Sequence, residues 1–525
     1  MEKKNQKIRA VCIAAAMIVG LILTRGISLD YCIYSHPDEP VFYGSTEALM
    51  LAIFHGEKPY EPIKAYPEGT YIFRLPFQLL AQKLPMDAEY AASVAIWGRI
   101  SSVFSYSIGC LLGLWLVYCV LGGGIAGAAM FALTVIFGLF QIEQSRYGTF
   151  DPISFFLIAL LLVLISLYIR KNKKRFLYTA AFSVGVLAAG KYPLALFFVL
   201  PFSVLLMEKL PKKETWLRFC IMAGLALVGF LLFSPSVLQS PRFLLTTVLG
   251  GVHGYIGGNP EGFATLPDKI ISFLAYHLFY SDLPAAPVFA VLCAIKLYKG
   301  EEKTLEQKFY AIILPTFSLF FLAYNLLLKT FFFRTLFPFF CIAMLYACAG
   351  MGRLCRGKTM RWLSLALCAL MVARGALLLF MLSDRGEEKY SSQKLQSQLD
   401  GRDIKSVEKM GVFFKPGFEL ETLSPEVVSV GIGDLWDGNF PEMESGQAIL
   451  TCSMEHGWAK YCLFPPRNRE IINITEGWEQ FKADNEPYLV GKLFPDYIYW
   501  LFGFWTHGST MSNYEFPSNW LYYKP

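Results

Sequence analysis

Two short stretches of the sequence carry carboxylates in settings where they could act as acids or bases. HPDEP (His36–Pro40) follows the first apolar run, and EQSRYGTFDP (Glu143–Pro152) directly precedes a later one. Isolated cations stand beside two further apolar runs, at Lys191 and Arg334. A carboxylate can accept a proton from a reacting group, while Lys and Arg can hold an anion such as phosphate. These residues predict an acid–base and anion-binding site, provided that the fold brings them together.

The elements that position these residues are predicted to lie in a membrane. The chain has 525 residues, of which 55% are hydrophobic and only 17% are charged, and its mean hydropathy is +0.43. Soluble domains carry about 25% charged residues. The stretches 122–140 and 152–169 contain no charged residue, and each is long enough to cross about 30 Å of hydrocarbon. The composition excludes a disordered chain, a small disulfide-rich secreted protein and an ordinary soluble enzyme.

We predict a polytopic α-helical membrane domain over residues 1–383, with about 11 transmembrane helices. The first runs from Ile8 to about Leu23. Because further spans follow it and a small-residue cleavage site does not, it is interpreted as a retained helix and not as a signal peptide. The other spans are expected at 92–120, 122–141, 152–169, 176–190, 192–207, 216–234, 284–299, 309–328, 333–350 and 362–382.

Basic residues in the loops predict the orientation of these helices. Lys and Arg cluster in alternate loops, at 3–9, 170–175, 209–218, 296–308 and 353–361. Because basic loops stay on the cytoplasmic side, the N-terminus is predicted to be cytoplasmic, with the protein in the plasma membrane. Both carboxylate stretches and both isolated cations then lie on the opposite face, as do the loops at about 29–91 and 235–283. The excess of Lys and Arg in the loops indicates how the helices are oriented in the membrane. It gives no reason to expect a nucleic-acid partner.

Residues 384–525 differ in composition from the rest of the chain. This tail has 13 basic and 21 acidic residues, whereas the remainder has 34 basic and 20 acidic residues. Short apolar runs at 412–414 and 427–430 are typical of strands, and Gly, Pro and Asn residues separate them. We predict an extracytoplasmic C-terminal domain with an α+β or mainly β fold, whose size suits one small domain.

The motifs and their order resemble one superfamily of membrane enzymes. An Asp-Glu pair in the first outer loop (Asp38–Glu39), SRYGTFDP opening the fourth span, Gly-Lys with Pro near the sixth and Arg334 before a Leu-Phe-Pro pattern are similar to the GT-C glycosyltransferases that use polyprenyl-phosphate sugars. GRISS (Gly98–Ser102) also looks like the Arg-x-x-Ser start of one branch, the protein O-mannosyltransferases and lipid A aminoarabinose transferases of families 39 and 83. The resemblance covers roughly residues 8–350.

The resemblance implies an integral-membrane, inverting glycosyltransferase. It would move a hexose or pentose from a polyprenyl-phosphate donor to an acceptor hydroxyl on the extracytoplasmic face. One general base is expected, because a phosphate leaves as an anion without being protonated, whereas glycosidases commonly use two carboxylates. Asp38 is the expected base. Glu39 and Asp151 are expected to orient the acceptor, a sugar hydroxyl or the base itself.

Four cations are candidates for holding the donor phosphate. Lys191 and Arg334 are the stronger pair, since Arg offers a planar bidentate fork and Lys a point charge. Arg146 and Arg99 are weaker candidates for the same anion. The implied partners are the lipid-linked sugar donor, membrane lipid, and a glycan, lipid or protein acceptor. Tyr66 stands where the aminoarabinose transferases carry a Lys, so the resemblance identifies neither the sugar nor the acceptor.

Each of these residues also has a purely structural interpretation. Asp38 and Glu39 could form a solvated turn in a Pro-rich loop. Asp151 before Pro152 suits a helix N-terminus, where an acid favours the helix dipole and Pro fits the first turn. The cations beside spans could reach from the apolar region to the interface, and for Arg99 and Arg146 a structural role is favoured.

No cofactor is predicted, although a divalent metal stays open as an alternative. Glu68, His253 and His277 carry ligand atoms, but their spacing matches no metal-binding motif such as HxxxH or CxxC. A lipid monophosphate donor also has less need of a divalent ion than a pyrophosphate, since Lys and Arg can neutralise its charge.

Two other classes of function compete with the enzyme. A membrane transporter or lipid flippase with an extracytoplasmic sensor domain would place ionisable groups near the middle of the membrane and often shows two related halves. This sequence has its polar groups at the rims and no internal repeat. A non-catalytic receptor or assembly scaffold would leave the rim carboxylates and cations without a role.

Overall fold

The computed structural model describes the helices, five strands and a few residues beside them. The described residues are 2–27, 29, 39–54, 68–86, 90–234, 237, 266–267, 270, 273, 282–283, 286–300, 304–328, 333–354, 357–383, 406–410, 427–430, 447–452, 479–484 and 518–523.

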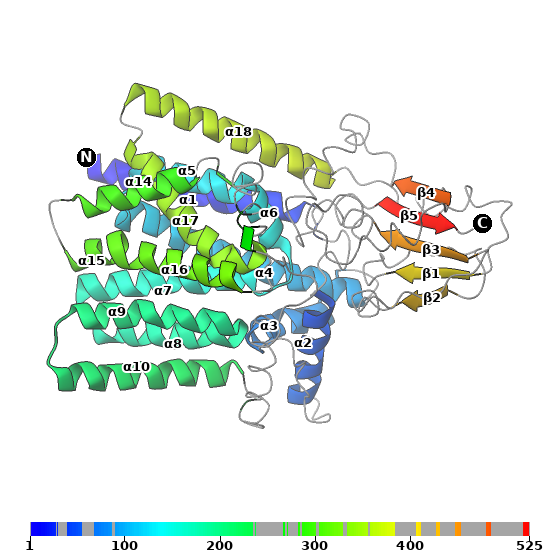
Figure 1. Cartoon of the computed structure of the whole chain (residues 1–525), viewed down its shortest axis with the longest axis horizontal. Helices are drawn as coiled ribbons and strands as arrows, with labels where there is room; N and C mark the ends of the chain where they lie inside the picture. Colours follow the sequence, from blue (N-terminus) through cyan, green and yellow to red (C-terminus); the bar gives the residue numbers. More distant parts are fainter. Residues whose placement is uncertain are drawn as a thin grey trace.

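Helices form the greater part of the described chain, and most of them lie alongside one another in a bundle (Figure 1). Two of the helical segments, η1 and η4, are π-helices, and two, η2 and η5, are 3-10 helices. In chain order the segments are α1 (Glu2–Gly26), α2 (Glu39–Phe54), α3 (Gly69–Lys83), α4 (Tyr90–Trp115), η1 (Leu116–Val120), α5 (Gly124–Phe137), α6 (Leu139–Arg146), α7 (Asp151–Lys171), α8 (Lys174–Gly190), η2 (Tyr192–Phe198), α9 (Val199–Met207), α10 (Lys212–Leu232), α14 (Ala286–Tyr298), α15 (Leu305–Lys308), η4 (Phe309–Ile313), α16 (Leu314–Leu327), η5 (Phe333–Leu336), α17 (Phe337–Leu354) and α18 (Lys358–Ser383).

Every range that the sequence predicts to span the membrane contains a helix. Among the described residues, seven helical segments are long and apolar enough to cross a membrane, and an eighth is added if α5 and α6 count as one span. The segments Tyr192–Met207 and Ala286–Tyr298 are apolar but shorter. The chain is therefore a polytopic, α-helical integral membrane protein. The number of 11 crossings stays a prediction.

The range 122–141, predicted as one span, is two helices with a sharp bend. The axes of α5 and α6 differ by 59°, and Gly138 between them is extended (φ −63°, ψ 129°). A β-carbon on Gly138 would lie 2.7 Å from a carboxylate oxygen of Asp282. That carboxylate accepts hydrogen bonds from the backbone N–H of Gln141 at 3.1 Å and from its side-chain amide at 2.7 Å. Asp282 thus binds the first turn of α6 and leaves no room for a side chain at position 138.

Arg25 occupies the other side of this bend. Its guanidinium donates to the carbonyl oxygens of Val135 and Ile136, the latter at 2.8 Å, and to the hydroxyl of Ser145 at 2.8 Å. The last carbonyls of a helix have no partner within the helix, and a cation is favoured beside them, as an anion is beside the first N–H groups. Arg25 at the end of α5 and Asp282 at the start of α6 supply these charges.

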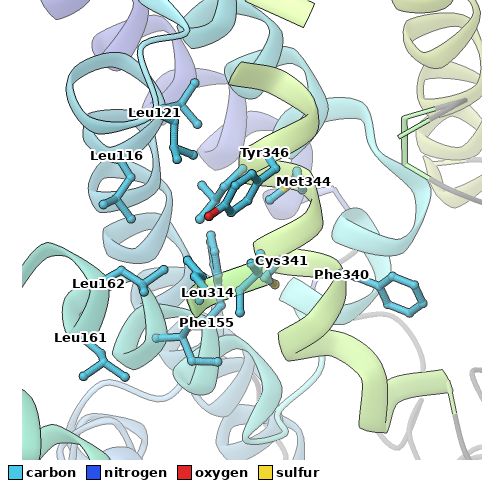
Figure 2. Packing of buried hydrophobic residues seen from close by; sticks show 14 of the residues in the cluster. Leu116, Leu121, Phe155, Leu161, Leu162, Leu314, Phe340, Cys341, Met344 and Tyr346 are labelled. Carbon is cyan, nitrogen blue, oxygen red and sulfur yellow. The ribbon is translucent and has the colours of Figure 1, made fainter. Parts of the chain in front are cut away.

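Large apolar side chains fill the centre of the bundle. Figure 2 shows Phe155 of α7, Leu314 of α16, and Cys341 and Tyr346 of α17 within one buried cluster. The Tyr346 hydroxyl donates to the backbone carbonyl oxygen of Tyr310, so the one polar atom of this ring is paired. Because lipid tails are as apolar as the core, close packing and internal hydrogen bonds hold such a bundle together.

Small residues bring α8 and α10 into backbone contact. A β-carbon on Gly185 would overlap the carbonyl of Ala226, and one on Gly229 would overlap the carbonyl of Phe182. This is the small-residue packing that membrane helices use to approach each other closely. It fixes the position of α8, whose C-terminal end carries Lys191.

The connections between helices lie at opposite ends of the bundle. The start of α1, the connections α7–α8 and α9–α10, the C-terminal ends of α14 and α17, and the N-terminal ends of α15 and α18 lie at the left end of Figure 1. These segments carry the basic clusters, so we call this the basic-loop end. α2 and α3 lie at the other end, with the sheet beyond them (Figure 1). The arrangement agrees with the predicted alternation of loops, and which end faces the cytoplasm stays a prediction.

The described part of the tail is a five-stranded mixed sheet in the order β2-β1-β3-β5-β4. Strand β1 lies between β2 and β3 and is parallel to both, whereas β5 lies between β3 and β4 and is antiparallel to both. The strand predicted at 427–430 is β2, and the run 412–414 lies outside the described residues. The strands are β1 (Ser406–Met410), β2 (Val427–Val430), β3 (Gln447–Cys452), β4 (Glu479–Asp484) and β5 (Ser518–Tyr523).

Candidate active site

Charged side chains gather at the end of the bundle opposite the basic loops. Five of them have at most 6% of their surface exposed, and a sixth, a lysine, is partly exposed. Burying a charge costs several kcal/mol unless partners compensate for the lost water. The partners of each charge therefore define what the site can do. We call this set the polar end: Arg25, Arg74, Arg99, Arg146, Asp151 and Lys191.

Asp151 and Lys191 form an ion pair. The Lys191 ammonium nitrogen lies 2.6 Å from a carboxylate oxygen of Asp151. The Asp151 side chain is only 3% exposed, whereas 27% of the Lys191 side chain is exposed. An ammonium has three N–H donors, so Lys191 can bind a second anion from its exposed side while it holds Asp151. Two residues that were predicted for different roles thus lie together.

The local sequence explains why these two residues meet. Asp151 begins α7 and Pro152 follows it, an order that suits the first helical turn because Pro lacks an N–H and an acid favours the dipole. α8 ends at Gly190, and Lys191 is extended (φ −154°, ψ 111°) before η2, whose second residue is Pro193. A cation beside the C-terminus of α8 is favoured by the same dipole. The ion pair joins the start of α7 to the end of α8.

Arg99 and Arg146 hold the chain where it leaves α1. A guanidinium nitrogen of Arg99 donates to the carbonyl oxygen of Leu29 at 2.8 Å, and one of Arg146 donates to the carbonyl oxygen of Ile27 at 3.1 Å. These carbonyls come shortly before Asp38 in the sequence. The two weaker candidates for phosphate binding therefore hold the chain directly after α1.

Arg74, on α3, is a buried cation outside the predicted set. Its guanidinium carbon lies 5.5 Å from the ring centroid of Phe42 and 4.9 Å from that of Tyr43, both on α2. Such cation–π contacts stabilise a desolvated guanidinium. A β-carbon on Gly148 would overlap the Arg74 guanidinium and lie 2.6 Å from the Tyr43 hydroxyl. The glycine of the SRYGTFDP motif is therefore needed for this close approach.

Three segments meet at the polar end through backbone contacts. A β-carbon on Gly69, the first residue of α3, would lie 2.7 Å from the backbone of Ala189 in α8. A β-carbon on Gly190 would overlap the ring of Phe150. The start of α3, the end of α8 and the turn before α7 are thus in mutual contact around the Asp151–Lys191 pair.

Burial raises the pKa of two groups near this end, Tyr71 and Asp282. It raises the pKa of the Tyr71 phenol on α3 to about 12, so this hydroxyl stays protonated at physiological pH. It also raises the pKa of Asp282, beside the bend between α5 and α6, to about 6, although hydrogen bonds from Gln141 act in the opposite direction. Asp282 is therefore mostly ionised at pH 7 and close to its titration range.

Three of the predicted site residues have side chains outside the described part of the chain. Asp38 lies outside the described residues altogether. Glu39 is the first residue of α2 and Arg334 lies in η5, but only their backbone is described. The roles predicted for these three residues stay predictions.

A metal site was left open by the sequence. Within the described ranges, there is no group of three or more His, Cys, Asp or Glu side chains that could hold a metal ion. Glu68 is buried at the start of α3, and His253 and His277 lie outside the described residues.

Two further residues of the site lay outside the predicted set, and only Arg25 has a sequence signal that could have identified it. Arg25 ends the first apolar run in the same way as Lys191 ends a later one, yet it lay outside the predicted set. Arg74 lies in the amphipathic stretch Ile72–Leu84, where an arginine on one face is ordinary. Its burial depends on the rings of α2, which the sequence of α3 does not reveal.

Comparisons with known proteins leave the family open. No family model matches the chain, and no curated protein matches it. The fold aligns with the crystal structure of ArnT from Cupriavidus metallidurans in the apo state, with a TM-score of 0.49 and 12% sequence identity over 90% of this chain and 95% of that one. At this level, the likeness assigns neither a family nor an activity to the chain.

Proposed function

We propose that the chain is an integral-membrane glycosyltransferase of the GT-C type, which transfers a sugar from a polyprenyl phosphate to an acceptor hydroxyl with inversion. The observation that carries this proposal is the pairing of Asp151, from the SRYGTFDP motif, with Lys191, from the Gly-Lys motif, at 2.6 Å. Two motifs far apart in the sequence thus meet in a charged site at the end of an apolar bundle. A donor with a lipid tail and an anionic phosphate requires both environments.

The proposed reaction is a direct displacement at the anomeric carbon. The acceptor hydroxyl oxygen attacks this carbon, its proton passes to the Asp38 carboxylate, and the bond between the anomeric carbon and the phosphate oxygen breaks. The electron pair of that bond leaves with the polyprenyl phosphate. Attack from the opposite side inverts the configuration, and one base suffices because the phosphate leaves without being protonated.

The cations of the polar end would stabilise the phosphate as negative charge develops on it. Lys191 is suited to this role because 27% of its side chain is exposed and an ammonium has three N–H donors, more than the contact with Asp151 requires. Arg334 is the proposed second phosphate ligand. Arg99 and Arg146 would act mainly by fixing the first outer loop, since both already bind backbone carbonyls at its start.

The buried carboxylate of Asp151 would orient the lysine and, through it, the donor. Removing one partner of a buried ion pair leaves an uncompensated charge. The pair therefore holds the ammonium in one place before the donor arrives, which is a form of preorganisation. Glu39, next to the proposed base, would orient the acceptor or the base.

The decisive experiment compares Asp38→Asn with the intact protein. Full-length protein in lipid nanodiscs is supplied with undecaprenyl-phosphate hexoses and pentoses labelled in the sugar, and with a membrane extract as acceptor. We expect the wild type to transfer at least one sugar and Asp38→Asn to lose about 10²- to 10⁴-fold in rate, the usual contribution of a general base. Binding of undecaprenyl phosphate should be retained.

The matched control is Glu306→Gln, which removes a carboxylate at the basic-loop end and should leave transfer unchanged. Equal rates for Asp38→Asn and the wild type would exclude Asp38 as the base. Failure of the wild type both to transfer any sugar of the panel and to bind undecaprenyl phosphate would contradict the proposed activity as a whole.

A further inference from the structure

We infer that the polar end also contains a binding site for the hydroxyl groups of the donor sugar, formed by Gln144, Thr149 and Thr70. This inference rests on the proposed function and extends it, because it assigns residues to sugar recognition. None of the three carries a charge, and none belongs to the residues predicted from the sequence motifs for base or phosphate.

All three side chains are buried and lack internal partners. Their exposed fractions are 1% for Gln144, 3% for Thr149 and 0% for Thr70. Within the part of the chain that the structure describes, both ends of the Gln144 amide and both threonine hydroxyls have no hydrogen-bond partner. Buried polar groups in native proteins are nearly always paired, and leaving one unpaired costs about 1–3 kcal/mol. Several such groups together indicate that a ligand supplies the partners.

The fold brings these groups to one place. Thr70 and Arg74 are four residues apart on α3 and therefore share a face of the helix. The Arg74 guanidinium meets Gly148, where no side chain intervenes, and Thr149 is the next residue. Gln144 lies four residues before Gly148, in the last turns of α6. The face of α3 with Thr70 thus lies against the segment that carries the other two residues.

The same contacts place this group next to the ion pair. Thr70 follows Gly69, whose backbone packs against Ala189 at the end of α8, directly before Gly190 and Lys191. Thr149 precedes Asp151 by two residues. A ligand that reaches Lys191 with its phosphate would therefore have its next chemical group beside the unpaired hydroxyls. In a polyprenyl-phosphate sugar, that group is the sugar ring.

The chemistry of the three side chains fits hydroxyl groups better than charges. A threonine hydroxyl and a glutamine amide each donate and accept hydrogen bonds, as a sugar hydroxyl does. The surrounding cations already have contacts or a proposed role: Arg74 contacts aromatic rings, Arg99 and Arg146 donate to carbonyls, and Lys191, which binds Asp151, is proposed to hold the phosphate. Neutral donors and acceptors remain for the neutral part of the ligand.

The test measures discrimination between sugars that differ by one hydroxyl. Transfer by full-length protein in nanodiscs is compared for the best donor of the undecaprenyl-phosphate panel and for its analogues that each lack one ring hydroxyl. We expect the wild type to disfavour at least one analogue by about 5- to 20-fold in kcat/KM, the value of one or two hydrogen bonds. Gln144→Leu or Thr149→Val should reduce that discrimination below about twofold.

Controls separate recognition from folding. Thr149→Ser keeps the hydroxyl and should keep the discrimination, while Thr134→Val makes the same change at a buried threonine of α5 and should have no effect on it. Affinity for undecaprenyl phosphate, which lacks a sugar, should be unchanged in Gln144→Leu and Thr149→Val. Loss of this affinity in both variants would assign the residues to structure or phosphate binding and overturn the inference.

The two proposals fail in distinguishable ways. If the wild type transfers sugar but Gln144→Leu and Thr149→Val discriminate as it does, the sugar site is wrong and the glycosyltransferase stands. If the wild type transfers no sugar of the panel and does not bind undecaprenyl phosphate, both are wrong.

Discussion

The two ends of the helical bundle handle charge differently. At the basic-loop end, cations pair with carboxylates: Arg170 with Glu306 at 2.8 Å and Lys174 with Glu214 at 3.5 Å, with side chains that are 21% to 55% exposed. Arg218 at the same end has a side chain that is only 9% exposed, and it pairs with Glu208 at 3.0 Å and Glu214 at 2.6 Å. At the polar end, the four arginines are at most 6% exposed, and Arg25, Arg99 and Arg146 each donate at least one hydrogen bond to a backbone carbonyl.

The difference suggests separate roles for the charges at the two ends: those in the basic loops set the orientation in the membrane, and those at the polar end belong to the proposed site. Exposed pairs contribute little to stability and need no precise geometry, so the basic-loop end is explained by the placement of loops at the membrane surface. Buried charges are costly and persist only where the surrounding structure compensates for them. The buried arginines and the unpaired neutral groups at the polar end are the reason that the proposed reaction is assigned to that end.

Among substitutions that test the difference between the two ends, Arg25→Ala is expected to lower the free energy of unfolding most. The change removes hydrogen bonds to Ser145 and to the carbonyls of Val135 and Ile136, and it leaves these groups buried. We expect the free energy of unfolding to fall by more than about 3 kcal/mol, measured by denaturation with sodium dodecyl sulfate in mixed micelles. Arg25→Lys keeps the positive charge but loses the guanidinium with its several N–H donors. Its free energy of unfolding should therefore lie between those of the wild type and Arg25→Ala. A change below about 1 kcal/mol would remove Arg25 from the structural account of the bend.

Asp282 is expected to make the stability of the folded chain depend on pH, with a smaller change in the free energy of unfolding. Its pKa is raised by burial from 3.8 to about 6, so between these values the folded chain holds more protons than the unfolded chain. Stability therefore falls as the pH rises from about 4 to about 6 and is then constant for this group. The loss amounts to about 3 kcal/mol. Asp282→Asn should remove that part of the pH dependence of the thermal midpoint, and identical profiles for both proteins would show that Asp282 titrates normally.

The smallest effect is expected at the basic-loop end, from Arg170→Ala. The pair with Glu306 is 36% and 21% exposed, and exposed pairs contribute about 0–1 kcal/mol. Denaturation with sodium dodecyl sulfate in mixed micelles should therefore show that the free energy of unfolding falls by at most about 1 kcal/mol. A loss as large as that of Arg25→Ala would erase the distinction between the two ends.

Much of the fold could be predicted from apolar runs and loop charges. Each predicted span contains a helix, and the segments with basic clusters lie at one end, because hydrophobicity and positive charge are properties of single segments. The bend at Gly138 could not be predicted this way. It depends on Asp282, which is 144 residues further along the chain and binds the start of α6.

The candidate site was only partly accessible to the sequence. Asp151 and Lys191 were predicted from the charges beside apolar runs; they form an ion pair, and their roles in the site stay predictions. Their partnership was not predicted, because it arises from the packing of α7 against α8. Arg74 and the unpaired Gln144 and Thr149 were missed for a related reason: a polar residue shows no sign of burial until its neighbours are placed.

The contact between Gly148 and Arg74 also constrains how the sequence can change. The guanidinium fills the volume in which a side chain at position 148 would have to lie. A side chain at position 148 is thus tolerated only if position 74 carries a residue smaller than arginine. In evolutionary terms, the order of changes is constrained: position 74 can change first, whereas Gly148 has to be kept for as long as the arginine is present.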